Sequence, residues 1–171
     1  KVSKLKFFEI NFREANLGLS QNIIKGISKV LSKNDACIVF EDDLLVEDSA
    51  IDFINFFLNY ESKKFKFGSV SAFSYIENFK TKENFDYYIS YRHCSWGWGT
   101  WSKIWNKIDW DNIDYNKHFE NKNNLSNFSR GGMDLNLLLW GQYKNLINSW
   151  AIRFNLYCSS NNLLSLHPRY S

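Results

Sequence analysis

Residues Ala36–Val46 read ACIVFEDDLLV, and this stretch decides the predicted fold. It opens with an apolar run that is typical of a strand buried on both faces. Three carboxylates follow at once, Glu41, Asp42 and Asp43. Carboxylates at a strand end are costly to desolvate unless a cation meets them. Because ligands of open α/β sheets bind beyond the carboxyl ends of strands, the stretch predicts a divalent metal carrying a phosphorylated ligand.

The segments around this stretch alternate between strand and helix patterns. In chain order we expect a strand at residues 4–12, a helix from Ser20, the strand 36–40, a helix capped by Asp48 or Ser49, and a strand at 67–73. Apolar residues at helical spacing support both helices. This order favours right-handed crossovers, so the predicted fold class is α/β with a mixed, mostly parallel sheet flanked by helices.

The rest of the chain is predicted to add smaller elements. Short strands are expected at residues 86–91, 149–154 and 163–166, and Thr100 is expected to cap a helix ending near Lys107. A further helix is expected at residues 133–144, with these residues available to a core: Met133, Leu137, Leu138 and Trp140. We find no repeat and no linker rich in Pro, Gly or Ser, so residues 1–171 are predicted to be a single domain of a longer chain.

Composition excludes several classes of protein. The chain has 171 residues, of which 44% are hydrophobic and 18% aromatic, as expected of a globular domain. A net charge of +3, from 21 basic and 18 acidic residues, is too balanced to predict a nucleic-acid partner, though it is compatible with a peripheral membrane contact. Its three cysteines are widely spaced and odd in number, which fits a reducing compartment. We therefore expect a cytoplasmic protein, at most peripheral at the inner face of the membrane.

The acidic triplet has two interpretations. Hard carboxylate oxygens suit Mg²⁺ or Mn²⁺, with waters and a substrate diphosphate completing the coordination shell. The alternative is a solvated acidic turn, or charges that complement the N-terminus of the following helix.

A second motif, SWGWGTW, spans Ser95–Trp101. Trp96 and Trp98 would share a face of an extended chain, and Gly97 would allow a sharp turn or the close approach of a ligand. Trp98 has two interpretations. It either packs in an aromatic corner of the core or forms a wall that faces a ligand.

Asp134 is the third candidate, because it follows Gly131-Gly132 in the first turn of a predicted helix. A carboxylate on a rigid element suits a general base. An aspartate at this position is equally explained as a partner of the helix dipole.

Taken in order, these motifs resemble a known family. The set comprises RxxNxGL at 13–19, EDD at 41–43, WGWGTW at 96–101, GGxD at 131–134 and SWAIR at 149–153. It resembles the bacterial nucleotide-sugar glycosyltransferases of the GT-A fold that are related to N-acetylglucosaminyltransferase I. The resemblance covers nearly the whole chain and implies a Rossmann-like GT-A domain that lacks its first β-α unit.

The resemblance also implies residue roles. Asp43 matches the ligand of the Mn²⁺ or Mg²⁺ that bridges the donor diphosphate, and Asp134 matches the base of an inverting transferase. The positions that match the donor site are Arg13, Asn16, Gly18, Glu41 and Asp42. The positions that match the sugar or acceptor wall are Trp96, Gly97 and Trp98.

Two departures separate the chain from this family. The upstream strand and helix that carry part of the nucleotide-base pocket are absent, and so is a C-terminal segment after Pro168-Arg169. Where relatives often carry paired acidic residues, this chain has Met133-Asp134.

Three functional hypotheses follow. The first is an inverting, metal-dependent glycosyltransferase that moves a sugar from a nucleotide sugar to a hydroxyl of a glycan or lipid-linked acceptor. The second is a non-catalytic nucleotide- or carbohydrate-binding module that retains the fold. The third is a nucleotidyl or phosphoryl transferase, which would also use acidic residues at a strand end.

Overall fold

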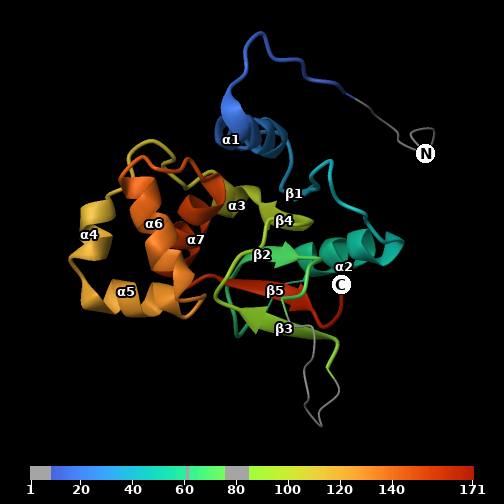
Figure 1. Cartoon of the computed structure of the whole chain (residues 1–171). Helices are drawn as coiled ribbons and strands as arrows, with labels where there is room; N and C mark the ends of the chain where they lie inside the picture. Colours follow the sequence, from blue (N-terminus) through green and yellow to red (C-terminus); the bar gives the residue numbers. More distant parts are fainter. Residues whose placement is uncertain (1–8, 61, 76–84) are drawn as a thin grey trace.

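The computed structural model describes residues 9–60, 62–75 and 85–171 (Figure 1). Within these residues, a five-stranded mixed sheet is flanked by helices. The elements are α1 (Gly18–Leu31), β1 (Ala36–Val39), α2 (Asp48–Leu58), β2 (Phe67–Ser71), β3 (Tyr87–Ser90), β4 (Trp98–Trp101), α3 (Ser102–Trp105), α4 (Tyr115–Phe119), α5 (Lys122–Ser129), α6 (Asp134–Tyr143), α7 (Trp150–Ser160) and β5 (Leu164–Pro168). The predicted α/β class with a mixed sheet is therefore confirmed.

The strands lie in the order β1-β4-β2-β5-β3. β4 pairs antiparallel with both β1 and β2, β5 pairs parallel with β2, and β3 pairs antiparallel with β5. Three strands, β1, β2 and β5, therefore run in one direction, but β2 and β5 form the one parallel pair among the described strands. The expected predominance of parallel pairing is wrong because β4, from the second half of the chain, inserts between β1 and β2.

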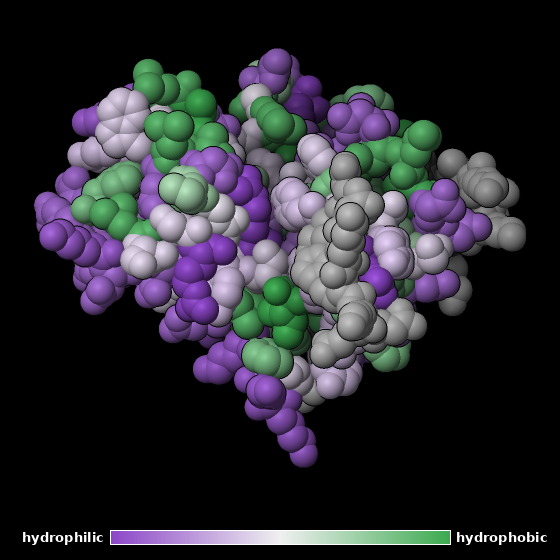
Figure 2. All heavy atoms as spheres, turned by 60° about the horizontal axis from the view of Figure 1, so that its bottom comes forward, coloured by the Kyte–Doolittle hydropathy of each residue, from purple (hydrophilic) through white to green (hydrophobic). Residues whose placement is uncertain are grey.

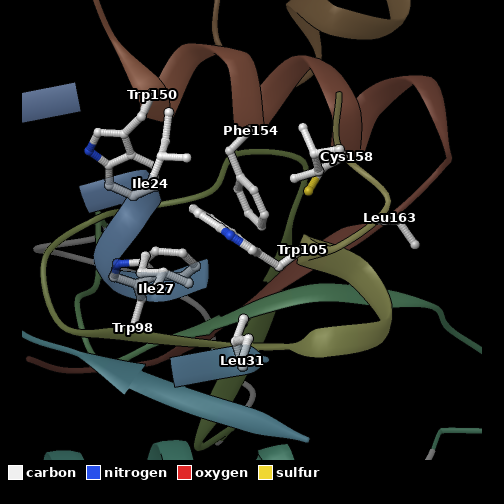
Figure 3. Packing of buried hydrophobic residues seen from close by; sticks show 10 residues of the cluster. Ile24, Ile27, Leu31, Trp98, Trp105, Trp150, Phe154, Cys158 and Leu163 are labelled. Carbon is white, nitrogen blue, oxygen red and sulfur yellow. The ribbon is translucent and has the colours of Figure 1, made fainter. Parts of the chain in front are cut away.

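Helices cover both faces of the sheet. On one face, α1, α3 and α7 bury a cluster around Trp98, Trp105 and Phe154 (Figure 3). On the other face, α2 packs Ile54 and Phe57 against β2 and β5. Alternate side chains of β1 point to the two clusters, as strand geometry requires. Helices thus pack on both sides of the sheet, but β1 itself is an edge strand whose residues are only half-buried, so the predicted full burial of this strand is wrong.

α7 occupies the segment that was predicted as a strand at residues 149–154. Trp150, Phe154 and Cys158 face the sheet, at the four-residue spacing of a helix. Ile152 and Leu156 face α5 and α6 in a second cluster. A helix buried on two sides reads as a nearly continuous apolar run, which six residues do not distinguish from a strand.

α6 confirms the helix predicted at residues 133–144 but turns a different face to the core. Leu135 and Leu139 are buried, whereas Met133 and Leu137 are 90% and 70% exposed. Both faces of this helix carry apolar residues, so the sequence pattern does not select the buried one. On the face of the molecule shown in Figure 2, hydrophobic residues form separate patches among hydrophilic ones. Exposed apolar side chains are therefore not by themselves a marker of the site.

Two further predictions differ from the structure in the described residues. Thr100 lies inside β4 instead of capping a helix, and α3 begins at Ser102. The strand predicted at residues 4–12 lies partly outside the described residues, and residues 9–12 form no strand. No helix in the described part of the chain is long and apolar enough to cross a membrane.

Gly99 of β4 packs closely against α2. This close packing gives a prediction about stability. A Cβ at Gly99 would lie 2.7 Å from Ile54 Cγ2 and 3.0 Å from the Cys37 carbonyl oxygen, so Gly99→Ala is expected to cost about 1–3 kcal/mol. Gly26, inside α1, has open space around its Cβ position, and Gly26→Ala should stabilise the protein by about 0.5–1 kcal/mol. Urea unfolding of both variants measures the difference, and equal effects would contradict this close packing.

Candidate functional site

A groove of about 700 Å³ opens at the carboxyl ends of the three strands that share a direction. Phe40 follows β1, Ala72 and Phe73 follow β2, and Pro168 ends β5, and all four line the groove. Residues 44–47 and the start of α2 form another wall. The groove therefore lies at the edge of the sheet where open α/β folds bind ligands.

The acidic triplet lies in the loop between β1 and the wall formed by residues 44–47. Glu41 is half-buried, Asp42 and Asp43 are exposed, and the Glu41 carbonyl accepts a hydrogen bond from the Leu44 amide at 3.4 Å. Burial raises the pKa of Glu41, and the charges of Asp43 and Asp42 raise it further. Neither ion pair formed by the described residues involves the triplet. Among the described residues, its negative charge therefore has no ion-pair partner.

This loop does not form a ready-made metal cage. Among the described residues, no group of three or more His, Cys, Asp or Glu side chains is arranged to hold a metal ion. The donor chemistry nevertheless fits a cation that takes most of its shell from water and substrate, because Asp43 presents hard, uncompensated oxygens to solvent. The assignment of Mn²⁺ or Mg²⁺ to Asp43 stays a prediction.

Trp96 and Gly97 lie in the groove, as their assignment to a sugar or acceptor wall requires. Trp96 is 49% exposed and packs edge-on against Phe73, with ring centroids 4.7 Å apart. Gly97 has φ +65°, and a Cβ there would lie 2.8 Å from the Phe40 ring. A glycine is thus needed both for the backbone conformation and for the contact with Phe40.

Trp98 does not belong to this wall, which corrects the prediction. Its side chain is 0% exposed and stacks on Trp150, with ring centroids 5.2 Å apart (Figure 3). Residues two apart share a face only while both lie in an extended strand. Trp98 begins β4, whereas Trp96 precedes β4 and lies outside the paired strands. Since the chain turns at Gly97, the two side chains do not share a face.

Asp134 begins α6 and is held by Arg92. The guanidinium Nη1 and Nη2 donate to Asp134 Oδ1 and Oδ2 at 2.8 and 3.0 Å. These hydrogen bonds hold the pKa of the Asp134 carboxyl below its usual value and raise the pKa of Arg92. Gly132 makes room for the pair, because a Cβ there would lie 2.6 Å from both Arg92 Nη1 and Asp134 Oδ1. Gly132 therefore makes room for this ion pair, whereas Gly131 lies against Leu135 and the Tyr91 backbone.

A smaller cavity of about 180 Å³ lies beside the groove. Arg92 and Trp96 both line it, and Trp96 also lines the groove. Trp96 is therefore the wall that the two hollows share. Asp134 itself lines neither hollow, so the structure places it beside the candidate site rather than inside it.

The predicted donor-binding turn lies in a separate hollow. Arg13, Asn16 and Gly18 line a depression of about 340 Å³ at the start of α1. The Asn16 side chain accepts a hydrogen bond from the Gly18 amide at 2.8 Å, and Gly18 has φ +71°. This depression shares no lining residue with the groove. The structure therefore brings the turn residues together with one another but not with the acidic triplet.

Two arginines with structural roles are not among the predicted site residues. Arg92 binds Asp134, and the buried Arg153 of SWAIR donates to the Trp110 and Ser149 carbonyls and to the Ser20 hydroxyl. Arg153 thereby ties α7 to α1 through Ser20, the residue that follows RxxNxGL. The carboxylate of Asp134 is a signal that a cation lies nearby, but it does not indicate which one.

The ion pair gives a prediction about acidity. In Arg92→Gln the two charged hydrogen bonds are lost, so the pKa of Asp134 should rise toward its unfolded value. Because the pKa of Asp134 is lowered in the folded protein, the pair stabilises the fold above the unfolded pKa, and this contribution disappears as the pH falls through the folded pKa. Carboxyl ¹³C NMR titration measures the shift, with Arg130→Gln as the control. An unchanged Asp134 titration in Arg92→Gln would contradict the assignment.

Comparisons of the chain with protein-family models, with curated proteins and with solved structures gave no match.

Proposed function

We propose that this protein is an inverting, metal-dependent glycosyltransferase that uses a nucleotide-sugar donor. The observation that supports the proposal most is the convergence of β1, β2 and β5 on one groove, with carboxylates at its rim that form no ion pair with other described residues. Trp96 lines both this groove and the cavity lined by Arg92, and Arg92 is the partner of Asp134. The ordered set of sequence motifs supplies the reaction class.

In this proposal the acceptor hydroxyl oxygen attacks the anomeric carbon while the bond from that carbon to the diphosphate breaks. Asp134 accepts the hydroxyl proton, and the nucleoside diphosphate leaves with the bonding electrons. Asp43 would hold Mn²⁺ or Mg²⁺, which would neutralise charge on the departing diphosphate.

The ion pair leaves Asp134 able to act as a base. Each carboxylate oxygen accepts one hydrogen bond from Arg92 and keeps a second lone-pair site for the acceptor hydroxyl. The lowered pKa keeps Asp134 ionised at neutral pH. The side chain is 53% exposed, so an incoming hydroxyl can reach it.

The test is a panel of nucleotide sugars with Mn²⁺ and with sugar acceptors, scored by release of nucleoside diphosphate. We expect release that a chelator abolishes and that Asp43→Ala lacks. Release of pyrophosphate would instead indicate a nucleotidyl transferase.

One observation favours the second candidate, a non-catalytic nucleotide- or carbohydrate-binding module. Asp134 is fully paired with Arg92, as a structural carboxylate would be. Sugar or nucleotide binding without release of nucleoside diphosphate from any donor would identify this alternative.

A further inference from the structure

We propose that a hollow at the amino ends of β2 and β5 binds a mononucleotide or another planar aromatic phosphate without a metal ion. The hollow has a volume of about 590 Å³, within the range of about 300–1,000 Å³ that is usual for ligand pockets. It shares no lining residue with the groove, so a ligand bound here is separate from the donor and the acceptor of the proposed function.

The hollow lies at the end of the sheet opposite the groove. Phe67 begins β2, Leu163 precedes β5, and Trp101 ends the antiparallel strand β4; all three line the hollow. The groove, by contrast, is lined by Ala72, which follows β2, and by Pro168, which ends β5. The length of the strands therefore separates the two hollows.

Aromatic rings from three segments of the chain form walls of the hollow. They belong to Tyr60 after α2, to Phe65 and Phe67 around the start of β2, and to Trp101 at the end of β4. Tyr60 is 50% exposed and the other three are half-buried. The indole of Trp101 is held in place, because its Nε1 donates a hydrogen bond to the Leu58 carbonyl at 2.9 Å. Such rings stack on a planar base, whichever base it is.

The charged side chains of the described lining are cationic. Lys66 and Lys103 line the hollow, no Asp or Glu is among the described residues that do, and Glu61 lies outside the described residues. Neither lysine takes part in an ion pair between described residues. Lys103 Nζ lies 6.0 Å from the centroid of the Trp101 ring, which places a cation beside an aromatic wall. Because an ammonium group binds phosphate as a point charge, flat rings together with unpaired lysines fit an aromatic phosphate.

Hydrogen bonds hold residues 62–66 in position beside the hollow. Ser62 Oγ accepts hydrogen bonds from the amides of Lys64 and Phe65 at 3.2 and 3.0 Å. The carbonyl of Lys66 accepts one from the Leu164 amide at 2.9 Å. The fold itself therefore positions this segment, which lowers the entropy cost of binding a ligand.

The test measures binding of AMP by calorimetry in the presence of a chelator, and compares it with binding of adenosine and of ribose 5-phosphate. We expect AMP to bind about tenfold or more tightly than either, because adenosine lacks the phosphate and ribose 5-phosphate lacks the ring. Lys66→Gln combined with Lys103→Gln should weaken AMP binding about tenfold. Lys25→Gln, at an exposed position on α1, is the matched control and should leave the affinity unchanged.

A second variant tests the aromatic wall. Phe65→Leu should weaken AMP binding about fivefold and leave binding of ribose 5-phosphate unchanged, since only the base stacks on the ring. Lys66 and Lys103 are both exposed, so the double lysine variant should unfold at the same temperature as the unaltered protein and remains informative if Phe65→Leu is unstable.

Four results would overturn the inference. Equal affinity for AMP and ribose 5-phosphate would indicate a general anion patch, and unchanged AMP affinity in the double lysine variant would place AMP elsewhere. AMP binding that requires Mn²⁺ and is lost in Asp43→Ala would assign the nucleotide to the candidate donor site. An eight-nucleotide single strand that binds far more tightly than AMP would indicate a nucleic-acid surface.

The donor assay distinguishes failure of this site from failure of the proposed function. If a donor releases nucleoside diphosphate but AMP does not bind in the presence of the chelator, the aromatic phosphate site fails while the transferase proposal stands. If AMP binds as expected but no donor releases nucleoside diphosphate, the aromatic phosphate site is supported and the transferase proposal fails.

Discussion

Asp134→Asn is expected to lower turnover by about 10²–10⁴-fold, the usual contribution of a general base, while donor affinity is unchanged. Asparagine keeps the shape of the side chain and one acceptor oxygen for Arg92, but it cannot take up the acceptor proton. The measurement is steady-state release of nucleoside diphosphate, together with calorimetric binding of the donor product in the presence of Mn²⁺.

Stability is the necessary control for this variant, because Asp134 forms one of the two ion pairs of the described residues. Its side chain is 53% exposed, so loss of the pair should cost no more than about 1 kcal/mol. Asp52→Asn, at an exposed position on α2, is the matched control and should retain full activity. Near-normal turnover in Asp134→Asn would remove Asp134 from the mechanism.

Trp98→Ala is expected to have the largest effect on folding. Trp98 is 0% exposed and contacts Trp105, Trp150 and Phe154 within the cluster that joins α1, α3 and α7 to the sheet (Figure 3). Removing its indole should cost about 3–5 kcal/mol, which lowers Tm by about 6–20 °C in a domain of this size. Calorimetry or thermal circular dichroism measures the change.

Trp96→Ala is the matched control, since it removes the same side chain two residues earlier. Trp96 is 49% exposed, so its loss should lower Tm far less. If the two variants were equally stable, Trp98 would not be the core residue that its burial indicates.

The sequence pattern predicts much of the fold where local physics dominates. The strand at 36–40 and the helices α1 and α2 follow from short apolar runs and from helical spacing. The missed helix α7 and the wrong choice of the buried face of α6 have a common cause. α7 is buried on two sides and α6 is apolar on two sides, so neither has the one-sided pattern that identifies an amphipathic helix.

The candidate site, too, is predicted only in part by the sequence. The order of motifs identifies the acidic loop, Trp96 and Asp134 as chemically notable positions, but it contains no information about which cation Asp134 meets. Arg92 lies 42 residues earlier and becomes its partner only because the segment after β3 meets the start of α6 in the folded chain. The turn at residues 13–18 shows the opposite case. The motif set assigns it to the same donor site as the acidic triplet, but in the folded chain it lines a separate hollow.

By itself, the sequence determined that β1 is a strand with apolar side chains on both faces and that three carboxylates follow it, since both properties depend on residues adjacent in the chain. The tertiary structure alone decided that β4 inserts between β1 and β2, that Trp98 is core while Trp96 borders the groove, and that Asp134 pairs with Arg92. These outcomes depend on contacts between distant segments, whose free energy comes from burial and charge pairing and is invisible to any local pattern.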